Sequence, residues 1–199
     1  ILLITVPATI GMMLLSKPIV YLFFERNAFD STATAMTSSA LFYYSVGLIG
    51  SSLRMILNKV FYSFQDTKTP MINGAIAVIL NVVLNLLFIR FMAHDGLALA
   101  TSISAIFTAV LLFVDLRKKM GPIGLKGMLI TFLKVFFAAL IMGIVVYIIY
   151  FKLGSLIATN KFLELIMLLI SIGIGALVYF LLCMAFKVEE VSKIINFRR

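Results

Sequence analysis

Residues 71–92, MINGAIAVILNVVLNLLFIRFM, form a long apolar run in which Arg90 is the single charged side chain. A helix needs about 20 mainly apolar residues to cross the hydrocarbon core of a bilayer. Five further segments meet this requirement, at 1–24, 34–63, 97–116, 128–151 and 162–186. Spans of a membrane β-barrel are shorter and alternate apolar with polar residues, which these runs do not. The sequence predicts an all-α, polytopic membrane protein with six transmembrane helices.

The composition agrees with this class. Hydrophobic residues make up 63% of the chain, charged residues 13%, and the mean hydropathy is +1.16. Water-soluble domains are about 45–50% apolar, so an ordinary soluble core is excluded. The net charge of +9 lies mostly between the apolar runs, which favours loop charge on a membrane protein over nucleic-acid binding.

The basic residues are distributed unequally between the two sides of the predicted bundle. Alternate loops lie on opposite sides of a membrane, and the side richer in Lys and Arg is cytoplasmic. One side carries Lys68, Arg117, Lys118, Lys119, Lys126, Lys187, Lys193, Arg198 and Arg199, and the other carries Arg26, Arg90, Lys152 and Lys161. We therefore expect the 66–70 turn, the 117–126 loop and the C-terminus to face the cytoplasm.

The sequence offers little for covalent catalysis. His94 is the only histidine and lies in a predicted turn, where a loop role is favoured over that of a catalytic base. Cys183 is the only cysteine and lies inside an apolar run. No cluster of residues has metal-ligand spacing and no glycine-rich phosphate loop follows a strand. These patterns disfavour an enzyme and predict no cofactor, with a sodium ion as the one candidate discussed below.

Two basic residues within spans are candidates for a substrate cavity. Ionisable side chains inside a bilayer face a cavity, a partner or the interface. Arg54 lies deep in its predicted span, and its planar guanidinium suits phosphate, whereas Lys59 lies near the interface. Lys17 is the comparable residue of the first span. A cavity and an interface remain alternative locations for Arg54 and Lys17.

Asn81 and Asn85 lie one turn apart on one face of the third span, and the fourth span contributes Thr101. Two interpretations follow. The amide oxygens, a threonine hydroxyl and a free backbone carbonyl would suit a small hard cation. Alternatively, these side chains form hydrogen bonds between helices, which is favoured because no carboxylate accompanies them.

The last two spans carry small residues that favour close packing of helices. They are Ala138, Ala139, Gly143, Gly173, Gly175 and Ala176. An apolar groove for a lipid tail is the alternative. Residues 188–199 place apolar side chains at helical spacing among charged ones, which predicts either a cytoplasmic amphipathic helix or a polar tail. Because the chain begins with Ile1, we expect it to be a piece of a longer protein.

Several motifs resemble those of one family, the MurJ/MviN lipid II flippases of the multidrug/oligosaccharidyl-lipid/polysaccharide exporter superfamily. They are PATIG at 7–11, KPIVYLF at 17–23, Phe29, ALFYYSVGL at 40–48 and FYSFQDTKTP at 61–70. The resemblance extends with good spacing to Lys119 and by helix number to the end of the chain.

The resemblance implies a two-lobe fold of fourteen transmembrane helices, of which this chain would hold the C-terminal six. Residues 1–120 would form four helices of the C-terminal lobe, and 121–187 a final pair with a lipid-tail groove. The missing N-terminal lobe would then be a partner. The family's main cationic cavity residues lie in earlier helices, so Arg54 and Lys17 do not inherit that role directly.

A sodium site of this family is matched by Asn81, Asn85, the Leu97 carbonyl and Thr101. Asn85 stands where the family site has Asp, which removes one negative charge from the set.

The implied function is transport of lipid II, a lipid-linked anionic peptidoglycan precursor, from the inner to the outer leaflet by alternating access. Two alternatives remain open. One is a polysaccharide or drug exporter of the same superfamily, and the other is a membrane scaffold that does not transport.

Overall fold

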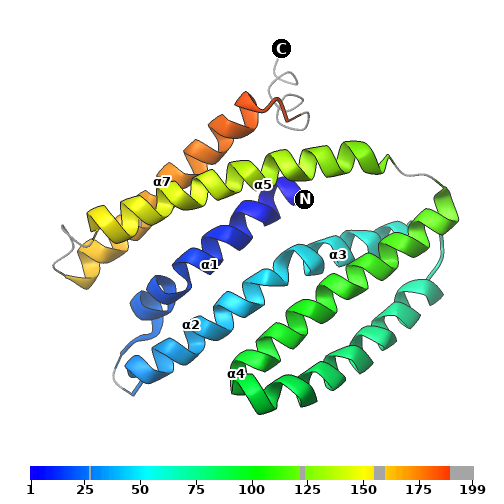
Figure 1. Cartoon of the computed structure of the whole chain (residues 1–199), viewed down its shortest axis with the longest axis horizontal. Helices are drawn as coiled ribbons and strands as arrows, with labels where there is room; N and C mark the ends of the chain where they lie inside the picture. The colour runs from blue at the N-terminus through cyan, green and yellow to red at the C-terminus, as the bar shows by residue number, and fades with distance from the viewer. Residues whose placement is uncertain (27, 122–123, 155–159, 189–199) are drawn as a thin grey trace.

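The computed structural model describes residues 1–26, 28–121, 124–154 and 160–188 of the chain (Figure 1). Within these ranges every regular element is a helix. The helices are α1 (Leu2–Phe24), α2 (Ser31–Val46), α3 (Leu48–Ser63), α4 (Lys68–Met120), α5 (Leu125–Tyr147), the π-helix η1 (Ile148–Gly154) and α7 (Lys161–Ala185). The all-α prediction is confirmed.

The described helices expose apolar side chains and bury polar ones, as expected for a protein in lipid. Phe91 is 85% exposed and Phe162 71%, whereas Ser45, Ser102 and Thr108 are at most 2% exposed. Four helices are long and apolar enough to cross a membrane, and α2 with α3 forms a fifth, bent candidate. The protein is therefore a multi-pass membrane protein.

The predicted spans at 71–92 and 97–116 are two helices that lie side by side and are joined by a sharp reversal; together they make up α4 and are its two arms (Figure 1). The reversal occurs at Ala93, whose φ of 47° and ψ of −124° leave the helical region. We expected the break at His94–Gly96, but these residues already belong to the second arm. Counting the two arms separately reproduces the six predicted spans.

The predicted span at 34–63 is divided into α2 and α3, which meet at Gly47 with a bend of 44°. Asp30 caps the start of α2, since its Oδ1 accepts the Ala33 N–H at 2.8 Å. In contrast, α1 is one helix through both Pro7 and Pro18, although each proline removes a backbone hydrogen bond from it.

The packing order of the helices positions the sites. α1 packs against α2 and α5, the second arm of α4 lies beside α2 and α3, and α7 packs on α5. Ala138 and Ala139 are fully buried, and a Cβ on Gly143 would lie 2.9 Å from Leu14 Cδ1. Close packing is thus confirmed for part of the predicted small-residue set. It is wrong for Gly173 and Ala176, which are exposed.

The predicted amphipathic segment at 188–199 lies, apart from Val188, outside the described residues. Val188 itself is buried and belongs to the cluster formed by α1, α5 and α7.

Candidate functional site

The four predicted cation-site residues are brought together by one chain of hydrogen bonds between the arms of α4. Asn85 Nδ2 donates to Asn81 Oδ1 at 3.0 Å, and Asn81 Nδ2 donates to Thr101 Oγ1 at 3.4 Å. Thr101 Oγ1 in turn donates to the Leu97 carbonyl at 2.9 Å. The reversal at Ala93 places the two arms side by side, so residues from both predicted spans meet.

The oxygen atoms of this network are of the kinds that bind a small hard cation. Amide, hydroxyl and carbonyl oxygens are the ligands that such ions prefer. Asn85 Oδ1 is buried and has no hydrogen-bond partner among the described residues, so one acceptor is free. The set is uncharged, and the amide nitrogens of both Asn side chains lie among the oxygens. Binding therefore requires amide rotations that replace the internal hydrogen bonds by ion contacts.

Nearer the far end of the α4 arms, Asn73 and Asp115 form a second polar contact that the sequence did not single out as a site. Asn73 Nδ2 donates to Asp115 Oδ2 at 2.9 Å, and Asn73 is 4% exposed. Lys118 Nζ lies 3.3 Å from Asp115 Oδ1. The signal that was available is Asn73 at the start of a span and Asp115 at the end of the next.

Asp66 organises the turn that precedes α4. Its carboxylate accepts the Thr69 N–H at 3.1 Å and the Thr69 hydroxyl at 3.0 Å, and it contacts Lys119 at 2.6 Å. The hydrogen bond from Lys119, followed by that from the Thr69 N–H, lowers the pKa of Asp66 to about 2. α4 begins at Lys68, and Asp66 supplies a capping oxygen to the first turn of this helix.

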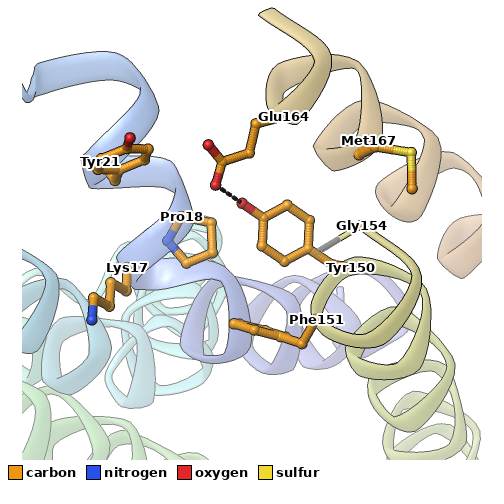
Figure 2. A pocket seen from close by; sticks show the side chains of 8 residues that line it. All are labelled: Lys17, Pro18, Tyr21, Tyr150, Phe151, Gly154, Glu164 and Met167. Carbon is orange, nitrogen blue, oxygen red and sulfur yellow. Dashed lines mark hydrogen bonds between the residues drawn. The ribbon is translucent and has the colours of Figure 1, made fainter. Parts of the chain in front are cut away.

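Lys17 borders a cavity of about 390 Å³ where α1, η1 and α7 meet (Figure 2). The other lining residues are Pro18, Tyr21, Tyr150, Phe151, Gly154, Glu164 and Met167. Figure 2 shows the Lys17 ammonium directed away from the Tyr150–Glu164 hydrogen bond. Lys17 is therefore at the edge of this cavity and exposed, with no hydrogen bond or ion pair in the described part of the chain.

Polar contacts at this end of the molecule join α7 to α1 and η1. Tyr150 OH donates to Glu164 Oε1 at 3.1 Å, and Lys161 Nζ donates to the Glu25 carbonyl at 3.0 Å. The Lys161 ammonium also lies 4.6 Å from the centre of the Tyr21 ring. This cluster was not predicted from the sequence, although a carboxylate such as Glu164 near the end of an apolar run is a recognisable signal.

An apolar cavity of about 380 Å³ lies between α1, α2 and α5. Its lining residues are Ile10, Met13, Leu14, Phe42, Leu140, Gly143, Ile144 and Tyr147. Of the small residues predicted to form a lipid-tail groove, only Gly143 lines this space.

Arg54 is exposed on α3 and does not line either of these two cavities. In the described ranges its guanidinium has no hydrogen bond or ion pair, and Lys59 on the same helix is also exposed. The structure therefore does not bring Arg54 and Lys17 into one pocket.

His94 lies at the reversal of α4, with Nε2 3.1 Å from Asp95 Oδ1, and Ser39 Oγ donates to Asp95 Oδ2 at 2.6 Å. Over the described residues there is no group of three or more His, Cys, Asp or Glu side chains that could hold a metal ion.

Comparison with known proteins gives one consistent family. Residues 1–186 match the family model described as lipid II flippase MurJ. A relative named "Lipid II flippase MurJ" from Thermosipho africanus is 31% identical over 195 residues, which cover 98% of this chain and 37% of the relative. A "Probable lipid II flippase MurJ" from Vibrio cholerae is 41% identical over 112 residues, covering 56% of this chain and 21% of the relative.

The fold is also similar to a solved structure, "Lipid II flippase MurJ, inward closed conformation". The TM-score is 0.79 at 30% sequence identity, covering 96% of this chain and 37% of that one. The chain therefore spans no more than 37% of the length of these three relatives.

Proposed function

Because the chain belongs to the MurJ family of lipid II flippases, we propose that it is part of a protein that moves lipid II across the bacterial plasma membrane. The cargo would be a lipid-linked anionic peptidoglycan precursor, carried from the inner to the outer leaflet. The observation that carries this proposal is the match of residues 1–186 to the family. The likeness of the fold to a solved relative over 96% of the chain supports it.

The proposed mechanism is translocation without covalent chemistry. An anionic headgroup is costly to place in hydrocarbon, so it needs a polar path, whereas the lipid tail can stay in the membrane. In alternating access, one bundle of helices rocks against another around a central site. The described helices would form one of these bundles, and the other lobe of the longer protein would be the partner.

We assign the parts of the chain as follows. Residues 1–120 would be four helices of the C-terminal lobe, and 121–187 the final helix pair. The apolar cavity between α1, α2 and α5 supports a path for the lipid tail beside this pair, since it is lined almost entirely by apolar side chains. Membrane lipids would fill it when no substrate is bound.

Arg54 and Lys17 are proposed to contact the headgroup. Both are exposed and have no hydrogen bond or ion pair among the described residues, so both cations are available to a ligand. A guanidinium can donate two parallel hydrogen bonds to a phosphate. Arg54 would therefore bind the diphosphate in the central cavity, and Lys17 would attract it from the edge of its own helix.

The orientation follows from the charges at the two ends of the bundle. Lys68, Arg117, Lys118 and Lys119 gather at the end where α3 joins α4 and α4 ends. By the positive-inside rule we propose that this end, and with it the C-terminus, faces the cytoplasm.

A sodium ion is proposed at Asn81, Asn85, Thr101 and the Leu97 carbonyl. Bound there, the ion would supply positive charge between the two arms of α4. Among these residues, the hydrogen bond from Asn81 to Thr101 joins the two arms. Coupling the spacing of the arms to ion binding would link transport to an ion gradient.

The experiment that tests the function is replacement of the endogenous lipid II flippase in a bacterium by the full polypeptide that carries this chain. We expect growth without lysis when the endogenous protein is depleted, and lysis when Arg54→Ala is supplied at equal abundance. If cells lyse with the unmodified protein present in the membrane, lipid II transport is contradicted. A scaffold instead predicts that Arg54→Ala and Asn81→Ala both support growth.

A further inference from the structure

The bend between α2 and α3 lies at Gly47, where the second arm of α4 comes close to the chain. Its φ of −77° and ψ of −10° are accessible to every residue, so the bend does not depend on the backbone freedom of glycine. Glycine is required here because a larger side chain would clash with the neighbouring helix. A Cβ on Gly47 would lie 2.7 Å from Ser102 Oγ and 2.8 Å from Ser102 Cα. Gly47 therefore lets the second arm of α4 touch the bend.

Ser102 completes the hydrogen bonding that the bend interrupts. In a continuous helix the Gly47 N–H would bond to the Tyr43 carbonyl, but here it donates to Tyr44 O at 3.0 Å. Ser102 Oγ donates to the freed Tyr43 carbonyl at 2.6 Å. Ser102 is 2% exposed, so water does not readily replace it. An unpaired carbonyl inside a membrane protein is costly, and Ser102 therefore stabilises the bent form over a straight one.

The second arm of α4 also contacts the chain beyond the bend. A Cβ on Gly50 would lie 2.6 Å from the Ile106 N atom, so α3 is as close to α4 as α2 is. On the α2 side, Ser45 Oγ donates to Leu41 O at 2.7 Å, a type of bond that often accompanies helix bending. The second arm of α4 thus contacts both sides of the bend. It does so through Ser102 and Ile106, which lie one helical turn apart.

We propose that Gly47 and Ser102 form a two-state pivot in which the Ser102–Tyr43 hydrogen bond holds α2–α3 bent and its loss lets the pair straighten. The proposal rests on the proposed alternating access. Arg54 lies seven residues beyond Gly47, about 10 Å along the helix, so straightening from 44° would move it by about 8 Å. Ser102 is a positioning residue, since it acts on Arg54 through the direction of α3.

The pivot can be tested by measuring the distance between spin labels at Thr32 and Tyr62, both exposed, in the full polypeptide with its cysteines replaced. Each label lies 15 residues from Gly47. A bend of 44° gives a backbone separation of about 42 Å, and a straight pair gives about 45 Å. We expect Ser102→Ala to shift the distribution by about 3 Å toward the longer distance.

Ser104→Ala is the matched control. Ser104 is buried on the same helix, but its hydroxyl has no hydrogen-bond partner among the described residues. The distance distribution of Ser104→Ala should equal that of the wild type, and the flipping rate of Ser104→Ala should exceed that of Ser102→Ala. Identical distributions for all three proteins would overturn the pivot, even if they all transport lipid II. A shift with no flipping by the wild type would support the pivot and contradict the proposed function instead.

A second variant covers the case in which Ser102→Ala does not fold. Gly47→Ala keeps the Ser102 hydroxyl but drives it away from Tyr43, so the same lengthening is expected. Gly74→Ala is its control, because nothing lies within 4 Å of the added Cβ. A Gly47→Ala protein with the wild-type distance would overturn the proposal.

Discussion

Lys119 Nζ lies 2.6 Å from Asp66 Oδ2, so the end of α4 is tied to the turn from which the same helix begins. The Lys119 ammonium also lies 5.9 Å from the centre of the Phe61 ring and 5.7 Å from that of Phe64. This contact closes the α4 hairpin at the end opposite Ala93. Both ends of the hairpin are therefore fixed, one by the reversal itself and the other by an ion pair.

The Asp66 carboxylate should make stability depend on pH in a defined window. Its pKa is lowered from 3.8 to about 2 in the folded protein, so its contribution is complete above the unfolded value and is lost as pH falls from about 4 to about 2. Asp66→Asn should lower the melting temperature in detergent at neutral pH, and the difference from the wild type should disappear near pH 2. A difference that stays constant across this window would contradict the ion pair. Lys118→Ala, which alters a more exposed ammonium, should show no such dependence.

Asn73→Ala should destabilise the α4 hairpin, because it removes the hydrogen bond that Asp115 receives between the two arms. Loss of a partly buried hydrogen bond to a charged group costs about 1–3 kcal/mol of unfolding free energy. Gly74→Ala, at the next residue, meets nothing within 4 Å and should not destabilise. Denaturant unfolding in detergent measures both variants. Equal stabilities for Asn73→Ala and the wild type would show that Asp115 does not need this partner.

Two glycines of α7 should differ sharply in their tolerance of larger residues. A Cβ on Gly175 would lie 2.5 Å from Val146 Cγ2, whereas a Cβ on Gly173 meets nothing within 4 Å. Gly175→Val should therefore cost about 1–3 kcal/mol through overpacking against α5. Gly173→Val should be close to neutral. Thermal unfolding in detergent measures the stability of both variants. If the two variants unfold alike, the packing of α7 on α5 is not as described.

Sodium should stabilise the full polypeptide if the oxygen set between the α4 arms binds it, since a ligand specific to the folded state raises its stability. Thr101→Val removes one ligand and should weaken the sodium-dependent rise in melting temperature. Asn85→Asp adds a carboxylate and should strengthen it. Potassium at equal ionic strength is the control. A melting temperature with the same response to both ions in every variant would rule out the site.

The number and type of helices could be predicted from the sequence because spans in a bilayer have a minimum length and must satisfy their own backbone hydrogen bonds. The bend at Gly47 could not be predicted from the sequence. Its φ and ψ are ordinary, and its cause is Ser102, more than fifty residues away. The reversal was expected at His94–Gly96 but occurs at Ala93, since local turn propensity fixes a break only to within a few residues.

The candidate site was predictable to a similar extent. Asn81, Asn85, Leu97 and Thr101 do meet, because residues one turn apart on one arm face the start of the other. The Tyr150–Glu164 contact was missed, since it depends on how η1 and α7 pack. Arg54 and Lys17 remain predictions as substrate contacts. Their exposure in this chain is consistent with a cavity shared with another part of the protein.

Transport in vesicles is the most direct measurement of whether this chain is part of a lipid II flippase. The full polypeptide would be reconstituted with fluorescent lipid II, and a membrane-impermeant quencher would be added outside. We predict that quenching continues beyond the fraction initially in the outer leaflet, and that Arg54→Ala slows this second phase. Quenching that stops at the initial outer-leaflet fraction, as in protein-free vesicles, would contradict lipid II transport by this protein.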